Sequence, residues 1–230
     1  MSDIFWWVVF PYICLVIMVF GTLYRFAFRQ LTWAAPSTEF FEKKWLRLGS
    51  PLFHYGIIFA FIGHIMGIVL PLSFYNAIGV TNHLYHIGAV YGGALAGIMV
   101  VVGLIILLIR KIVIDPVRIH ATFADFYSVI ALLIISGIGL YMTLFQNVTP
   151  EEFDYRSTIG PWFRSLFTLN PSYQLMSEIP VLFKVHTLLA FGLFASIPFT
   201  RLIHFYTIPV AYPVRSPQQY RSRAQYKKNK

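Results

Sequence analysis

The chain has 230 residues, of which 57% are hydrophobic and 12% are charged, and its formal net charge is +9. A mean hydropathy of +0.66 excludes an ordinary soluble domain of this size and predicts an integral membrane protein. Five membrane spans of about 20 residues, with their loops, would use up the chain, so we expect no separate soluble catalytic domain.

Five apolar runs predict an all-α bundle of five transmembrane helices in a single membrane domain, residues 1–230. The runs cover residues 4–26, 51–75, 84–109, 123–145 and 181–209. The first run lacks a basic leader and a small-residue cleavage site, so we interpret it as a retained span. Ser50 before Pro51 predicts the start of the second helix, and Thr122 with Asp125 predicts a capping box at the fourth.

The basic residues predict the orientation, because cytoplasmic loops collect Lys and Arg. Most of them lie between the first and second runs, between the third and fourth, and after the fifth. The 72–83 loop has none, and in the 146–180 loop Arg156 and Arg164 stand against four acidic residues. We therefore expect the N-terminus outside, the C-terminus inside, and residues 210–230 as a basic cytoplasmic tail. The net charge is then mainly a topology signal, with anionic lipid or partner docking as a second use, and nucleic-acid binding is not expected.

The loop 146–180 is long for a helical bundle. Within it, Trp162, Phe163, Leu166 and Phe167 have the spacing of a short interfacial helix. Two interpretations are open at this point: a lid over a pocket on the outer side, and an ordinary connection with interfacial aromatic residues.

Two of the apolar runs carry paired histidines, His54 and His64 in the second run and His186 and His204 in the fifth. Imidazoles in hydrocarbon are costly unless they are paired or bind a metal or cofactor. If the two helices are antiparallel, His64 lies level with His186 toward the outer face. His54 then lies level with His204 toward the inner face. Such pairs predict bis-histidine ligation of two b-type haems, with interhelical hydrogen bonding as the alternative. The single cysteine, Cys14, excludes thioether attachment and a cysteine-ligated iron–sulfur cluster.

The spacing of the histidines leaves one mismatch. Eighteen helical residues make five turns, which places His186 and His204 on one stripe. However, the rise from His54 to His64 is roughly 15 Å, whereas that from His186 to His204 is roughly 27 Å. Different tilts, or a kink at Pro198, could reconcile the two values.

Further residues near these runs are candidates for supporting roles. Arg201 precedes His204 by three residues and could pair with a haem propionate, or it could simply extend to the interface. Glycines 56, 63 and 67 of the second run could leave room for a macrocycle or serve helix packing. His83 and His86, at the outer start of the third run, are candidates for a quinol site, with a solvated pair as the simpler interpretation.

The sequence resembles the gamma subunit of respiratory nitrate reductase, a di-haem cytochrome b that anchors its complex. The resemblance covers nearly the whole chain and is carried by LTWAAPSTEFFEKKW, SPLFHYGIIFAFIGHIMGIVLP, YGGALAG and HTLLAFGLFASIPFTRLIH. It implies oxidation of membrane quinol, either menaquinol or ubiquinol, near the outer haem. Electrons would pass by the inner haem to a cytoplasmic iron–sulfur beta subunit and a molybdenum alpha subunit that reduces nitrate to nitrite.

The resemblance also implies a prokaryotic plasma membrane and places no nitrate-reducing site in this chain. Leu84 stands where some members of the family have a lysine at the quinol site, which leaves His83 or His86 as substitutes. Two alternatives remain: a similar cytochrome b subunit of a sulfite- or heterodisulfide-type reductase, and a haem-free transporter with a histidine relay. The absence of an internal repeat in the sequence counts against the transporter.

Overall fold

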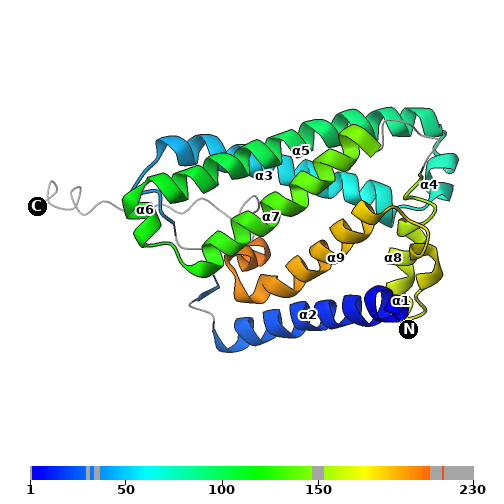
Figure 1. Cartoon of the computed structure of the whole chain (residues 1–230), viewed down its shortest axis with the longest axis horizontal. Coiled ribbons are helices and arrows are strands. Elements are labelled where there is room, and N and C mark those ends of the chain that lie inside the picture. Colours follow the sequence, from blue (N-terminus) through cyan, green and yellow to red (C-terminus); the bar gives the residue numbers. More distant parts are fainter. Residues whose placement is uncertain (1, 30–31, 34–36, 147–152, 208–213, 215–230) are drawn as a thin grey trace, which may run out of the picture.

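The computed structural model describes residues 2–29, 32–33, 37–146, 153–207 and 214. Among these residues the secondary structure is helical, and no strand occurs. Five helical segments are long and apolar enough to cross a membrane: Phe5–Phe28, Lys44–Val69, Asn82–Val113, Phe123–Gln146 and Val181–Phe199. Figure 1 shows them running along the long axis of the molecule. The prediction of an all-α bundle with five spans is confirmed.

The described elements are mostly helical segments of the five spans and of the connections between them. Their order is α1 (Ser2–Ile4), η1 (Phe5–Val9), α2 (Phe10–Phe28), α3 (Lys44–His64), η3 (Ile65–Val69), α4 (Leu72–Ala77), α5 (Asn82–Val113), α6 (Asp115–Ile119), α7 (Phe123–Tyr141), η4 (Met142–Gln146), α8 (Ile159–Phe167), η5 (Tyr173–Met176), α9 (Val181–Ser196), η6 (Ile197–Phe199) and η7 (Arg201–Thr207). The tail predicted at 210–230 lies outside the described residues, apart from residue 214.

The helices pack as two pairs joined by a fifth helix. α3 lies along α5, and α2 lies along α9. α7 packs against α5 and also contacts α9, so it links the two pairs, as its diagonal course in Figure 1 shows. The two helices that carry the histidines, α3 and α9, therefore belong to different pairs and face each other across the bundle.

The second span begins earlier than the sequence predicted. α3 starts at Lys44, and Pro51 lies inside it, so the prediction of a start at Ser50 and Pro51 is wrong. The carboxylate of Glu42 accepts a hydrogen bond of 2.8 Å from the backbone N–H of Trp45, which stabilises the earlier first turn. The capping box of Thr122 and Asp125 at the start of α7 is confirmed.

Helix α8 packs into the core and is hydrogen-bonded to the first span. Trp162 is fully buried, and its indole N–H donates a 2.9 Å hydrogen bond to the carbonyl of Trp7. Leu166 is also buried, and its carbonyl accepts a 2.8 Å hydrogen bond from the hydroxyl of Tyr12. The short helix predicted here exists, and its buried face favours the interpretation as a packed connection over that of a loose lid.

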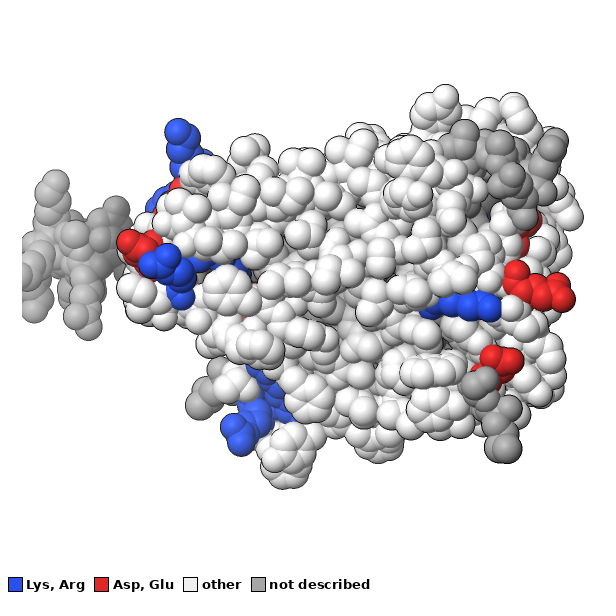
Figure 2. Space-filling view, viewed as in Figure 1, with Lys and Arg blue, Asp and Glu red and all other residues white. Residues whose placement is uncertain are grey.

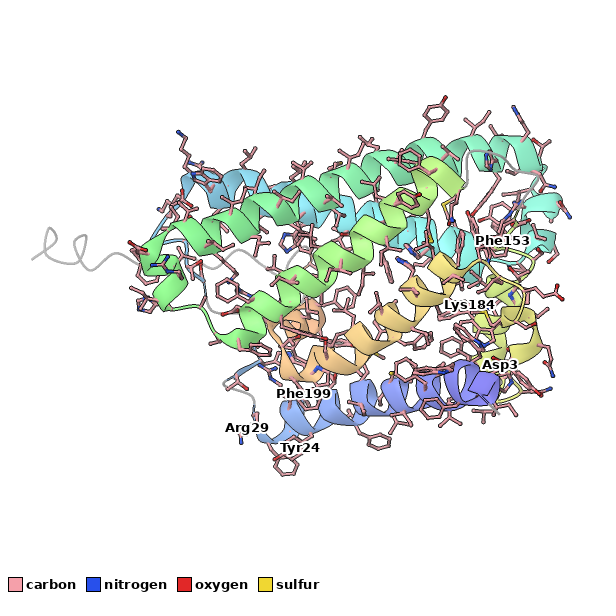
Figure 3. All side chains as sticks on the ribbon, in the orientation of Figure 1. Asp3, Tyr24, Arg29, Phe153, Lys184 and Phe199 are labelled. Carbon is pink, nitrogen blue, oxygen red and sulfur yellow. The ribbon has the colours of Figure 1, made fainter. Side chains whose placement is uncertain are left out.

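Charged side chains gather at the two ends of the bundle, and Figure 2 shows a wide apolar belt between them. One end, which we call the basic end, carries the Lys and Arg residues of the 37–47 segment, of the last turn of α5 and of α6: Lys43, Lys44, Arg47, Arg110, Lys111 and Arg118. Asp3, Phe153 and Lys184 lie at the opposite end, as Figure 3 shows. The apolar belt is what a lipid environment requires of a membrane-spanning surface.

Candidate functional site: two facing pairs of histidines

The structure brings the four histidines of α3, α9 and η7 together as two pairs. The rings of His54 and His204 lie toward the basic end, with their centroids 6.1 Å apart and their planes at 71°. The rings of His64 and His186 lie toward the opposite end, with their centroids also 6.1 Å apart and their planes at 15°. We call these the basic-end pair and the opposite-end pair. His54 thus faces His204 and His64 faces His186, as expected from the depths of these residues in two antiparallel helices.

The separation within each pair fits a metal ion between the rings. An iron–nitrogen bond of about 2 Å on each side, plus roughly 1 Å from nitrogen to ring centre, gives a centroid separation of about 6 Å. Within the described residues, no group of three or more His, Cys, Asp and Glu side chains could hold a metal ion. An iron between two imidazoles would therefore need its other ligands from a macrocycle, and a haem fits this donor set.

Hydrogen bonds fix the orientation of three of the four rings. The Nδ1 atoms of His54, His64 and His204 lie 2.7 Å from the carbonyls of Ser50, Ala60 and Arg201. A carbonyl only accepts, so each Nδ1 carries the proton and each Nε2 keeps its lone pair. That tautomer is the one a metal-ligating histidine needs. Nδ1 of His186 is buried without a hydrogen bond of normal geometry.

The break after α9 resolves the mismatch in rise. The α-helix ends at Ser196, followed by the 3₁₀ segments η6 and η7, so His186 and His204 do not share a stripe of one α-helix. A break at Pro198 is one of the two expected explanations of the mismatch. Ten residues separate His186 from Ser196, a helical rise of about 15 Å, which equals the rise from His54 to His64. His204 then reaches the level of His54 from η7, because Pro198 ends the regular hydrogen-bonding pattern.

Glycine positions show where space is kept around the rings. A Cβ added to Gly139 on α7 would lie 3.1 Å from Cε1 of His186, so this glycine makes room for the imidazole. Gly63, beside His64, has open space where its side chain would be. Gly56 instead packs closely on the backbone of α5, and Gly67 packs against Tyr155. Of these three glycines, Gly63 therefore leaves open space of the kind expected for a macrocycle, whereas Gly56 and Gly67 allow close packing.

Arg201 lies at the basic end in an ion pair with α7. Its Nη1 is 3.1 Å from Oδ1 of Asp125, the residue that also completes the capping box with Thr122. The ion pair ties η7, and thus the segment that carries His204, to the start of α7. Lys111 is buried close to the same carboxylate.

A second cluster at the basic end holds the segment before α3. The guanidinium of Arg110 is almost fully buried and donates four hydrogen bonds of 2.8 to 2.9 Å to Thr38 and Glu42. Burial alone would raise the pKa of the Glu42 carboxyl, but hydrogen bonds from the Trp45 backbone and from Arg110 lower it below its usual value. This end of the bundle is therefore rigidly braced.

The candidates for a quinol site lie at the start of α5. His83 is exposed and His86 is half-buried, in the first turns after the Thr81 cap. Beside them, the hydroxyls of Tyr85 and Tyr155 lie 3.1 Å apart, and the guanidinium of Arg156 stacks over the Tyr85 ring at 4.2 Å. Burial raises the pKa of the Tyr155 phenol, which keeps it protonated. The structure thus places a polar, aromatic cluster at the end where the opposite-end pair lies.

Sequence reasoning missed three residues that shape the site. Gly139 is an ordinary glycine in an apolar helix, and its closeness to His186 depends on tertiary packing. Arg25 donates to the carbonyls of Pro198 and Thr200, and Arg164 donates to the carbonyl of Ile68. In the sequence both arginines read only as topology signals, because their partners are backbone atoms of distant segments.

The chain is similar to known proteins along nearly its whole length. A family model described as "Nitrate reductase gamma subunit" matches residues 3–223. The nitrate reductase gamma chain of Bacillus subtilis is 38% identical over 97% of this chain and 100% of its own length. The respiratory nitrate reductase 1 gamma chain of Escherichia coli is 30% identical over 96% of this chain and 98% of its own length. An "Hdr-like menaquinol oxidoreductase cytochrome b-like subunit" of Archaeoglobus fulgidus is 29% identical over 71% of this chain and 48% of its own length.

Proposed function

The chain belongs to the nitrate reductase gamma subunit family, and from this membership we propose that it is the quinol-oxidising, di-haem cytochrome b subunit of a membrane-bound respiratory nitrate reductase. It takes electrons from membrane quinol near the opposite-end pair. It delivers them by way of the basic-end pair to an iron–sulfur beta subunit and a molybdenum alpha subunit, which reduces nitrate to nitrite. The observation that carries this proposal is the presence of two histidine pairs, each with 6.1 Å between ring centroids.

The proposed orientation has the basic end in the cytoplasm of a prokaryotic cell. The concentration of Lys and Arg at this end supports it, because such residues stay on the cytoplasmic side of a membrane. The basic-end pair then faces the cytoplasmic subunits, and the opposite-end pair lies near the outer face. The word menaquinol in the name of the Archaeoglobus relative supports a quinol as the electron donor.

The side chains of this protein would hold and orient the two haems. Bound haem supplies one-electron transfer between ferric and ferrous iron. The Nε2 atoms of the four histidines would bind the haem irons, and the Nδ1 hydrogen bonds of His54, His64 and His204 fix the orientation of their rings. Arg201 and Lys111, which lie close to the Asp125 carboxylate at the basic end, would neutralise haem propionates.

Oxidation of a quinol to a quinone releases two protons and two electrons. His83 and His86 stand at the proposed outer end, where an imidazole nitrogen can accept a proton from the quinol. Protons accepted there leave to the outside while the electrons move toward the cytoplasm. The subunit would thereby separate charge across the membrane and contribute to the proton-motive force.

A haem measurement on single-histidine variants tests this function. We would quantify pyridine haemochrome and record reduced-minus-oxidised spectra of the purified wild-type chain beside His64→Ala and His204→Ala. The expected result is two b-type haems per wild-type chain, with each substitution removing a different one. A wild-type chain without haem, expressed in cells that supply haem, would reject the cytochrome and favour a histidine-relay transporter.

A related function has one specific observation in its favour. The Archaeoglobus relative is named as part of an Hdr-like complex, so a cytochrome b subunit of a heterodisulfide- or sulfite-type reductase is the second candidate. The chain matches that relative over less than half of its length, whereas it matches the nitrate reductase gamma chains almost completely. Co-purification of the cytoplasmic subunits and their assay with nitrate would distinguish the two functions.

A further inference from the structure

Two arginines hold the irregular backbone at the ends of the helices that carry the histidines. We propose that Arg164 and Arg25 are positioning residues, each of which sets the placement of one haem-ligating histidine, His64 for Arg164 and His204 for Arg25. The inference rests on the proposed function, because it assumes that these histidines ligate haem.

We call the hydrogen bonds from each arginine to the backbone a clamp. The first clamp, made by Arg164, lies directly after His64. Helix α3 passes there into the π-helical turn η3, in which the N–H of Leu70 bonds the carbonyl of Ile65. The next donor in this register would be residue 71, but Pro71 has no N–H. The carbonyls of this last turn therefore need partners from elsewhere.

Side chains of two other elements supply these partners. The hydroxyl of Tyr75, on α4, donates a 2.6 Å hydrogen bond to the carbonyl of Met66. Nη1 of Arg164, on α8, donates a 2.7 Å hydrogen bond to the carbonyl of Ile68. A Cβ on Gly160 would lie 3.0 Å from this Nη1, so the glycine leaves the path open. The π-turn is thus tied to α8, which is itself anchored in the core.

The second clamp lies between α9 and His204. Pro198 removes an N–H from the end of α9, and Thr200 leaves the helix with extended backbone. Nη1 of Arg25, on α2, donates to the carbonyls of Pro198 at 2.8 Å and of Thr200 at 3.1 Å. Gly21, one turn earlier on α2, receives the proline ring, since an added Cβ would lie 2.7 Å from its Cγ. Four residues after Thr200 comes His204.

The two clamps, at opposite ends of the bundle, stabilise irregular backbone in the same way. Each guanidinium bonds backbone carbonyls that a regular helix would satisfy, at the C-terminal end of a histidine-bearing helix, where a cation is also favoured by the helix dipole. Without the clamp, the turn could rewind or fray, and the neighbouring imidazole would rotate. Ligand orientation is what such outer contacts tune in a metal site.

A crossed experiment on the intact complex in membranes tests the proposal. We would compare Arg164→Gln and Arg25→Gln by redox titration and by electron paramagnetic resonance of the ferric haems. The two signals are assigned beforehand from His64→Ala and His204→Ala. The expected result is that Arg164→Gln shifts the g-values and midpoint of the outer haem alone, and that Arg25→Gln shifts those of the inner haem alone. Lys184→Gln is the charge control, since it removes an outer-end cation whose hydrogen bond, within the described part of the chain, goes to the carbonyl of Ser177 and not to the π-turn.

Several outcomes would overturn the proposal. A change in midpoint without a change in g-values, equal in Arg164→Gln and Lys184→Gln, would mean that only charge matters. Shifts of both haems in both variants would mean a general loss of structure. If Arg164→Gln fails to assemble, Tyr75→Phe removes only the hydroxyl donor to the same turn, and an unchanged outer haem there rejects the clamp. For the second clamp, Arg25→Lys keeps the charge, and unchanged g-values of the inner haem there reject it. A wild type without two haems would instead reject the proposed function itself.

Discussion

Gly139 offers a direct measure of how tightly the ring of His186 is held. A Cβ at this position would lie 3.1 Å from Cε1 and 3.7 Å from Nδ1 of that ring. Because carbon atoms in contact lie about 3.5 to 4.0 Å apart, Gly139→Ala would push the ring by roughly 0.5 Å, whereas metal–ligand distances vary by only about 0.2 Å. Overpacking costs about 1 to 3 kcal/mol. We therefore expect haem binding between His64 and His186, the opposite-end pair, to weaken by about 5-fold to 150-fold.

Gly137→Ala is the matched control for this substitution. Gly137 lies on the same helix, and no heavy atom lies within 4 Å of the Cβ that would be added there. Two residues along a helix point in directions about 200° apart, so this Cβ faces away from His186. Both changes raise helix propensity equally, by about 1 kcal/mol. Haem quantitation and redox titration should show two haems in Gly137→Ala and a weakened outer haem in Gly139→Ala, and identical haem content and midpoints in the two variants would refute the reasoning.

Further predictions concern the braces around the site. Arg110→Ala should lower the free energy of unfolding by about 2 to 3 kcal/mol, measured by thermal unfolding in detergent, because it removes charge-assisted hydrogen bonds. The pKa of Glu42 is lowered in the folded chain, so this stabilisation is complete above the ordinary carboxyl pKa of about 4.3 and is lost as the pH falls below it. The difference in melting temperature between the wild type and Arg110→Ala should therefore be constant above about pH 5 and shrink in stronger acid. Trp162→Ala should cost about 3 to 5 kcal/mol in the same assay and expose the outer loop to protease. Asp125→Asn should shift the midpoint of the inner haem, whereas Asp115→Asn, which breaks an exposed ion pair, should leave both midpoints unchanged.

The five spans could be predicted because hydropathy depends only on local composition. The capping box of Thr122 and Asp125 could be predicted for the same reason, since its partners are three residues apart. The start of α3 could not, because it depends on the position of the Glu42 carboxylate, which Arg110 holds from 68 residues away in the chain. Pro51 lies inside α3, where a proline costs a helix about 3 kcal/mol or more. The buried contacts of Arg110 with Glu42 and the packing of α3 along α5 outweigh this cost.

The pairing of the histidines could be expected from the sequence because depth in an antiparallel pair is nearly a count of residues. The route of the chain to His204 could not, because it depends on where the α-helix stops. In the sequence, aromatic and aliphatic residues continue past Pro198, but the α-helix does not, and Arg25 and Gly21 of α2 stabilise the departure from the helix. The stop at Ser196 also gives the two helices equal steps of about 15 Å between the levels of the pairs. A straight fifth helix would carry His204 roughly 12 Å past His54. The break thus brings His204 to the level of His54, and Arg25 and Gly21, which hold the break, support the basic-end pair as proposed haem ligands.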